Sequence, residues 1–205
     1  DHRGGAPGVL ETLPVDRLWL APGALADPAY GALLDVARRR RVRVETPARG
    51  AAPLVLGDLR VEVLWPPREL PGGDNDRSLV LRVGVAGGAR VLLPGDVEHA
   101  GEAGLLASPE RLEAEVLKLS HHGSRTSSSD AFLRAVGARV ALASAPCLGR
   151  FAMPHPDVAA RVAAAGASLW WTGRDGAVAV GLAQPLVARG FAARSLRERA
   201  FCGGR

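Results

Sequence analysis

The chain has 205 residues, 47% of them hydrophobic, so it can bury one substantial core and is expected to form one domain or two small ones. Charged residues make up 23%, which argues against disorder throughout, and no apolar run approaches the roughly 18–20 residues that span a bilayer. The formal charge of +5 comes almost entirely from arginine; it is most simply a coding bias, although it also suits a polyanionic partner.

The first part of the chain is expected to alternate between helices and strands. Apolar spacing predicts helices over 4–13 and 28–39 and strands over 15–20, 42–45 and 59–65. A polar loop over 68–77 then precedes a hairpin, in which strands over 78–83 and 89–93 flank a Gly-Gly pair.

The second half continues the alternation. It predicts a helix over 97–106 and a second short helix beginning at Ser108 and Pro109, which read as an N-cap and first-turn pair. Further strands are expected over 115–119, 138–144, 168–171 and 177–180, and further helices over 130–136 and 157–165. The last two strands are expected to close the sheet.

Interleaved strands and helices of this kind predict a layered α/β domain with mixed sheets. We expect residues 1–182 to form this domain and residues 183–205 to form a C-terminal tail without a clear partner. The two cysteines, Cys147 and Cys202, lie far apart in the chain and are expected to be single thiols.

Three polar clusters follow predicted strands or stand at helix starts: Asp1 with His2, then Asp96, then His121 with His122. Carboxylate and imidazole groups that converge at strand ends suit zinc, manganese or iron. A single Gly-Asp pair is more often a turn, and a single histidine is more often a surface or core group. Two adjacent histidines in a chain with five histidines favour a functional site.

Four sequence strings carry a family resemblance. They are NDRSLVL over 75–81, LLPGD ending at Asp96, LKLSHHGSRTSSS over 117–129 and PHP over 154–156. The chain resembles the metallo-β-lactamase-like domain of the ComEC-type DNA-uptake (competence) proteins, from Asp1 to about residue 181. The resemblance implies an αββα sandwich with mixed sheets and a metal site at one edge.

The first metal motif of that family has the form H-x-D-x-D-H, and Asp1 and His2 match its last two positions. The first His and the first Asp of the motif would lie upstream of Asp1. We therefore expect a domain that is incomplete at its N-terminus, with its first strands missing.

The resemblance implies a site for two divalent metal ions, zinc or manganese. Asp96 would bridge the ions about 3.5–4 Å apart, and Asp1 and His2 would hold one of them. One of His121 and His122 would complete the site, because neighbouring side chains in extended structure face opposite ways. The other would contact substrate or orient a ligand. Such ions lower the pKa of a bound water and stabilise phosphoryl charge, which suits phosphodiester hydrolysis.

Hydroxyl and amide groups near these ligands are candidate substrate contacts. Ser124 is the best candidate for a catalytic role among the hydroxyls, with Arg125 and Thr126 beside it for phosphate contact; the alternatives are helix capping by the serines and a solvent-exposed arginine. Asn75 and Ser78 stand where other superfamily members carry a further histidine. Asn75 either lines the site or makes an Asx turn.

Three further residues are weighed in the same way. The resemblance suggests that His155, between two prolines, faces the site as a catalytic group, whereas a single loop histidine is otherwise more often uninvolved. His99 is expected to face solvent. Lys118 interrupts an apolar strand and either extends along a sheet edge or reaches towards the site.

The leading hypothesis is a metal-dependent nuclease that cleaves the non-transported strand during DNA uptake in natural transformation. The implied partners are single-stranded DNA and the membrane channel portion of the same parent protein, with no small-molecule organic cofactor. The resemblance implies a soluble domain of a membrane protein, on the outer face of the bacterial cytoplasmic membrane. Two alternatives stay open: hydrolysis of another phosphoester, for example of the choline-phosphate type, and a truncated, inactive domain.

Overall fold

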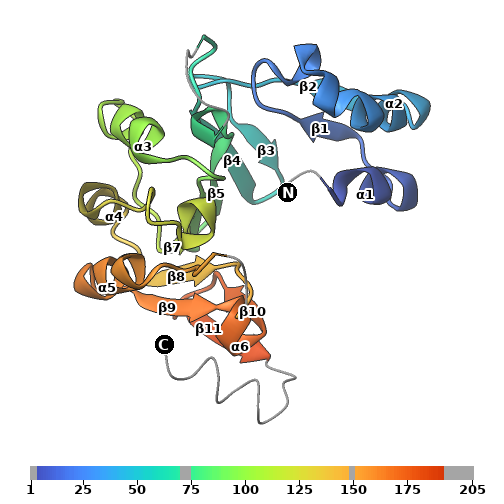
Figure 1. Ribbon diagram of the computed structural model, residues 1–205. Coiled ribbons are helices and arrows are strands. Elements are labelled where there is room, and N and C mark those ends of the chain that lie inside the picture. Colours follow the sequence, from blue (N-terminus) through green and yellow to red (C-terminus); the bar gives the residue numbers. More distant parts are fainter. Residues whose placement is uncertain (1–3, 70–74, 148–150, 192–205) are drawn as a thin grey trace.

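A seven-stranded mixed sheet is the largest element of the computed structural model, which describes residues 4–69, 75–147 and 151–191 (Figure 1). Its strands lie side by side in the order in which they follow one another in the sequence. They are β3 (Leu54–Leu56), β4 (Leu59–Trp65), β5 (Val80–Val85), β6 (Arg90–Leu93), β7 (Val116–Lys118), β8 (Val140–Ala143) and β9 (Ser168–Trp171). Neighbours from β3 to β6 are antiparallel, and neighbours from β6 to β9 are parallel.

Three helices connect the parallel strands: α3 (His99–Leu106), α4 (Asp130–Val136) and α5 (Pro156–Ala164). Because parallel strands added in one direction by right-handed crossovers carry their helices on one face, the three lie together, as Figure 1 shows. The sequence sets the ends of α4 locally. The Ser129 hydroxyl accepts a hydrogen bond from Phe132 N at its start, and Gly137 ends it in the left-handed region.

The main core lies between these helices and the sheet. Phe132, Leu92 and Leu117 are fully buried there, together with Val80 and Leu119. Burial of each such side chain contributes roughly 1.5–3 kcal/mol. This core therefore fixes the ends of β6 and β7, the strands that lead into the candidate site.

The N-terminal part forms a smaller unit with its own core. It comprises α1 (Ala6–Thr12), the parallel strands β1 (Arg17–Trp19) and β2 (Arg43–Glu45), the 3-10 turns η1 (Ala24–Ala26) and η2 (Pro28–Tyr30), and α2 (Gly31–Arg39). Leu33, Val36 and Ala37 recur on one face of α2 and are buried, with Leu10 of α1 in the same cluster. Figure 1 shows this unit to one side of the main sheet.

The C-terminal part corrects two expectations. Residues 177–180 do not close the main sheet, because β10 (Ala177–Gly181) pairs antiparallel with β11 (Val187–Phe191) in a separate two-stranded sheet. The start of the expected tail therefore has a partner, since β11 lies within residues 183–205. The division at residue 182 stays a prediction, and residues 192–205 lie outside the described part of the chain.

The remaining differences concern short elements. Residues 108–110 form a bend instead of the expected short helix, and the sequence analysis missed β3 and the short helix α6 (Thr172–Asp175). Cys147 is disulfide-bonded, so the expectation of a single thiol is wrong at this position. Within the described segments, no helix has both the length and the apolar character to cross a bilayer. The predicted α/β class with a mixed sheet is confirmed.

Candidate metal centre

The candidate site is a cavity at the carboxyl edge of the parallel strands. Its volume is about 940 Å³. Asp96 follows β6, His121 and His122 follow β7, residues 144–146 follow β8, and Thr172 follows β9. Parallel strands all end at the same edge of a sheet, which is where open α/β sheets bind ligands. The fold therefore brings together two of the three clusters that the sequence singled out.

The two adjacent histidines lie in a turn that is not extended. His121 has φ 46° and ψ 46°, and His122 has φ 57° and ψ 16°, inside the 3-10 segment η4 (Ser120–Gly123). The expectation that their side chains face opposite ways assumed an extended backbone and is therefore wrong here, since both line one cavity. Left-handed backbone at non-glycine residues costs roughly 1–3 kcal/mol each, and such strain concentrates at functional sites.

Backbone hydrogen bonds hold this strained turn in place. His121 N donates to Gly95 O at 3.1 Å, which ties the turn directly to the loop that carries Asp96. His155 N donates to Gly123 O at 2.8 Å, and Ser124 N donates to His121 O at 2.9 Å. The relative positions of Asp96 and the two imidazoles are thus fixed by the main chain.

His122 has the geometry of a metal ligand. Its Nε2 lies 3.9 Å from Asp96 Oδ1, and its Nδ1 lies 2.7 Å from Ser144 O. A carbonyl oxygen only accepts, so Nδ1 carries the proton and Nε2 presents a lone pair towards the Asp96 carboxylate. Histidine ligands of metals are held in this way by a hydrogen bond from the other ring nitrogen. The structure therefore favours His122, between the two histidines, as the ligand.

His121 is held by a carboxylate that the sequence analysis did not single out. Its Nδ1 lies 3.0 Å from Glu98 Oε1, and the Thr126 hydroxyl donates to the same oxygen at 2.7 Å. The Thr126 hydroxyl, with the His121 ring and the Asn75 side chain, holds the pKa of Glu98 below its ordinary value, against the opposing effect of burial. The signal available in the sequence was its place two residues after Asp96, in the same loop.

Side chains of the NDRS string over 75–78 form hydrogen bonds that hold the Asp96 loop and the start of α3. Ser78 Oγ accepts from Asp96 N at 3.0 Å, so Ser78 fixes the backbone of the Asp96 loop. A Cβ on Gly95, whose φ is 62°, would lie 2.7 Å from the Ser78 Cβ, so only glycine fits there. Asp76 Oδ1 accepts from the backbone N of Glu98 and of Gly101 at the start of α3. Substrate contact by Asn75 and Ser78 stays a prediction.

In the hydroxyl-rich loop after η4, some side chains line the cavity and another caps a helix. Ser124 and Thr126 line the cavity, with 2.9 Å between their hydroxyl oxygens. Arg125 is exposed, and its phosphate contact stays a prediction. Ser129 caps α4, which is the alternative weighed for the serines.

A buried carboxylate holds this loop. Glu102 of α3 is 1% exposed, and it accepts hydrogen bonds from Ser128 N and from Ser129 N. The sequence analysis missed it, because a glutamate in a helix ordinarily faces solvent.

His99, His155 and Lys118 lie at or beyond the edge of the cavity in the described part of the chain. His155 caps α5, its Nδ1 accepting from Asp157 N at 3.2 Å, and it lies outside the described cavity lining; its catalytic role stays a prediction. His99 is exposed, as expected. Lys118 Nζ donates to Leu119 O at 2.8 Å; burial lowers the pKa of this ammonium, and the Asp96 carboxylate opposes that shift.

The described residues supply part of a metal site. Asp1 and His2 lie outside them, and within the described segments no three histidine, cysteine or acidic side chains cluster to hold an ion. Asp96 and His122 nevertheless offer one oxygen and one nitrogen donor 3.9 Å apart. Bonds of about 2.0–2.2 Å from each donor reach a common point, so this pair fits a divalent ion such as zinc.

The family model described as "Metallo-beta-lactamase superfamily" matches residues 1–146. The chain belongs to the metallo-β-lactamase superfamily. The fold predicted from the sequence strings is therefore confirmed. Superfamily membership suggests a metal-dependent hydrolase, since the superfamily usually binds divalent metals.

Three curated proteins show which members of the superfamily the chain is similar to. ComE operon protein 3 of Bacillus subtilis (strain 168) is 34% identical over 158 residues, 77% of this chain and 20% of that protein. Competence protein ComA of Neisseria gonorrhoeae is 43% identical over 122 residues, 59% of this chain and 18% of that protein. Uncharacterized protein YcaI of Escherichia coli (strain K12) is 29% identical over 206 residues, 97% of this chain and 24% of that protein.

The predicted resemblance to competence proteins is confirmed by the first two relatives. The chain spans about a fifth to a quarter of the length of these three proteins.

Proposed function

We propose that this superfamily hydrolase is a metal-dependent phosphodiesterase, a nuclease that cleaves the non-transported strand during DNA uptake. The observation that carries the proposal is the pairing of His122 Nε2 with the Asp96 carboxylate at 3.9 Å, with His122 Nδ1 fixed on Ser144 O. The names of two relatives, a competence protein and a ComE operon protein, support the biological context. The positive formal charge of +5 suits a polyanionic substrate.

Asp96 and His122 would hold the divalent ion, with Asp1 and His2 as the further ligands that the family motif implies. When bound, zinc or manganese supplies an activated water near neutral pH and neutralises charge on the phosphoryl oxygens. The Ser144 carbonyl keeps the His122 proton on Nδ1, so Nε2 stays available as a donor atom. The strained turn at His121 and His122 needs no rearrangement during the reaction, because the folded main chain already holds it in place.

His121, Ser124 and Thr126 would handle the substrate. Glu98 accepts from His121 Nδ1, which leaves Nε2 as the ring atom that can accept a hydrogen bond from a water or hydroxyl group beside a bound phosphodiester. Thr126 donates its proton to Glu98 and accepts from the Ser124 hydroxyl. A phosphoryl oxygen would compete for that Ser124 proton, which makes Ser124 the hydroxyl that can turn towards the substrate.

We also propose that the catalytic domain acts on the outer face of the cytoplasmic membrane, beside the membrane channel portion of its parent protein. The competence relatives support a membrane-associated parent protein, of whose length this chain would account for about a fifth. Selective labelling of an engineered surface cysteine by a membrane-impermeant reagent in whole cells tests the outer-face placement. Labelling only after the cells are broken would refute it.

Cleavage of single-stranded DNA by the purified protein with manganese or zinc tests the nuclease proposal. We expect Asp96→Asn and His122→Ala each to lower the cleavage rate at least about 100-fold. Loss of a residue that only orients a metal ligand costs about 10- to 100-fold, so loss of a ligand itself should cost more. His99→Ala is the matched control, because His99 is exposed and lies outside the cavity lining. Cleavage that survives Asp96→Asn would refute the proposal, and turnover of a choline-phosphate ester in place of DNA would favour another phosphoesterase.

A further inference from the structure

One wall of the cavity is unsuited to a phosphate group. Besides the charged and hydroxyl side chains, the lining contains Pro146, Phe151 and Met153. Phe151 is 63% exposed, whereas Met153 packs against the main core. Covering an aromatic ring of this size with another apolar surface is ordinarily favourable, so the exposed part of the Phe151 ring can contact a ligand in the cavity.

The cavity is also larger than a phosphodiester linkage needs. Its volume of about 940 Å³ lies near the upper end of the roughly 300–1,000 Å³ that cavities for drug-sized ligands occupy. In the proposed function, the ion held by Asp96 and His122 would bind the phosphate, and the apolar wall remains for the groups attached to it.

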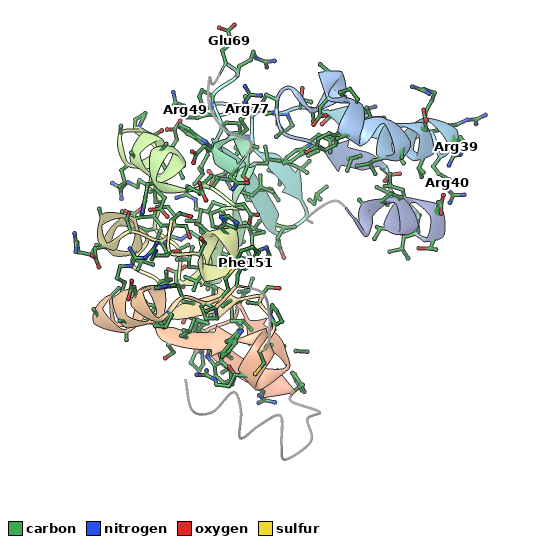
Figure 2. The ribbon with its side chains drawn as sticks, in the orientation of Figure 1. Arg39, Arg40, Arg49, Glu69, Arg77 and Phe151 are labelled. Atoms are coloured by element: carbon green, nitrogen blue, oxygen red, sulfur yellow. The ribbon has the colours of Figure 1, made fainter. Side chains whose placement is uncertain are left out.

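The position of Phe151 is tied to that of the histidines. Met153 N donates to Phe151 O at 3.0 Å, and two residues later His155 N donates to Gly123 O at 2.8 Å. A Cβ added at Gly123 would lie 2.7 Å from the Pro154 Cβ, so the segment that follows Phe151 packs directly on the histidine turn. Figure 2 shows the Phe151 side chain in the central part of the molecule, far from the N-terminal unit that carries Arg39 and Arg40.

We propose that Phe151 is a stacking platform for a nucleobase next to the scissile phosphate, which makes an unpaired strand the preferred substrate. Every base presents a π-face, so a ring beside a phosphate site binds single strands with little regard to sequence. In a duplex the same face is covered by neighbouring bases, and exposing it costs the energy of unstacking. The inference rests on the proposed nuclease function and adds the residue that selects the strand state.

The test is binding of a fluorescent single-stranded oligodeoxynucleotide, followed by anisotropy without added metal so that the strand stays intact. We expect Phe151→Ala to weaken binding about 5- to 100-fold, the range that one base–aromatic stack supplies, and Phe151→Trp to preserve it. An abasic strand of the same length should bind Phe151→Ala and the wild type equally. Phe191→Ala is the matched control, because Phe191 is 60% exposed and lies on β11, outside the described cavity lining.

Steady-state cleavage with manganese gives a second readout. Loss of the stack should raise KM for the base-containing strand and leave KM for the abasic strand unchanged. Unchanged binding of the base-containing strand by Phe151→Ala, equal weakening of both strands, or no binding of either strand by the wild type would overturn the stacking role. Phe151-dependent binding without any cleavage would instead refute the nuclease proposal and leave the platform standing.

Discussion

Glu102 is the buried side chain on which the shape of the hydroxyl-rich loop depends. Glu102 is 1% exposed, and its carboxylate accepts hydrogen bonds from Ser128 N and Ser129 N. The bond from Ser129 N is 2.9 Å long. Ser128 has φ 56°, so the loop passes through the left-handed region where the glutamate holds it. Replacing Glu102 by glutamine keeps the shape of the side chain and exchanges one acceptor oxygen for an NH₂ donor, which faces a backbone N–H.

The expected loss of stability in a Glu102 variant follows from these two hydrogen bonds. A hydrogen bond to a charged group contributes about 1.5–3 kcal/mol, and a buried donor left without its partner costs about 1–3 kcal/mol. We therefore expect Glu102→Gln to lower the free energy of unfolding by about 2–3 kcal/mol. Glu102→Ala, which removes both acceptors, should lower it by about 3–5 kcal/mol.

Urea denaturation, followed by circular dichroism, measures the free energy of unfolding of both Glu102 variants. A shift of the transition midpoint with an unchanged m-value reports the change in stability. Glu11→Gln is the matched control: this exposed glutamate has an ion pair at 3.7 Å with Arg39, so its loss should change stability by less than about 0.5 kcal/mol. A Glu102→Gln protein within about 0.5 kcal/mol of the wild type would show that the carboxylate does not hold the loop.

Two further predictions concern the sheet and its packing. A Cβ on Gly104 would overlap the Trp65 ring, so Gly104→Ala should destabilise by about 1–3 kcal/mol in urea denaturation, whereas Gly8→Ala, with open space around it, should not. Although burial opposes the shift, the Arg90 guanidinium lowers the pKa of Glu115 from 4.5 to about 2. The Arg90–Glu115 pair therefore stabilises the fold fully above pH 4.5, and its contribution is lost as the pH falls through about 2. Glu115→Gln should therefore lower stability at neutral pH by about 1 kcal/mol, after allowance for solvent screening, and flatten the acid limb of a stability-versus-pH curve; an acid limb identical to that of the wild type would contradict this.

The sequence predicted those elements whose ends are set locally. The strand over 59–65 and the helix over 130–136 have the predicted bounds, because Pro66 stops the first and Ser129 and Gly137 delimit the second. Elements defined by tertiary pairing were less accessible. The strand β10 joins β11 instead of the main sheet, and its apolar alternation looks the same in either pairing.

The candidate site divides in the same way. Its residue types and their place after strands were visible in the sequence, so Asp96, His121 and His122 were predicted together. The left-handed turn at His121 and His122 was not predicted, because positive φ is uncommon at any residue other than glycine, even at histidine, which is only several-fold enriched there. Glu98 and Glu102 were missed because their roles come from contacts with residues about 23 to 28 positions away. Only the place of Glu98 two residues after Asp96 is visible in the sequence.

Metal affinity of single variants tests the central claim most directly. Calorimetric titration of the purified protein with zinc or manganese should give binding that His122→Ala and Asp96→Asn each weaken at least about 100-fold. His121→Ala removes only a ring held by Glu98, so it should weaken binding by no more than the roughly 10-fold lower bound for loss of an outer partner. Full affinity in His122→Ala, with affinity lost in His121→Ala, would contradict the assignment and the geometry on which the proposed chemistry rests.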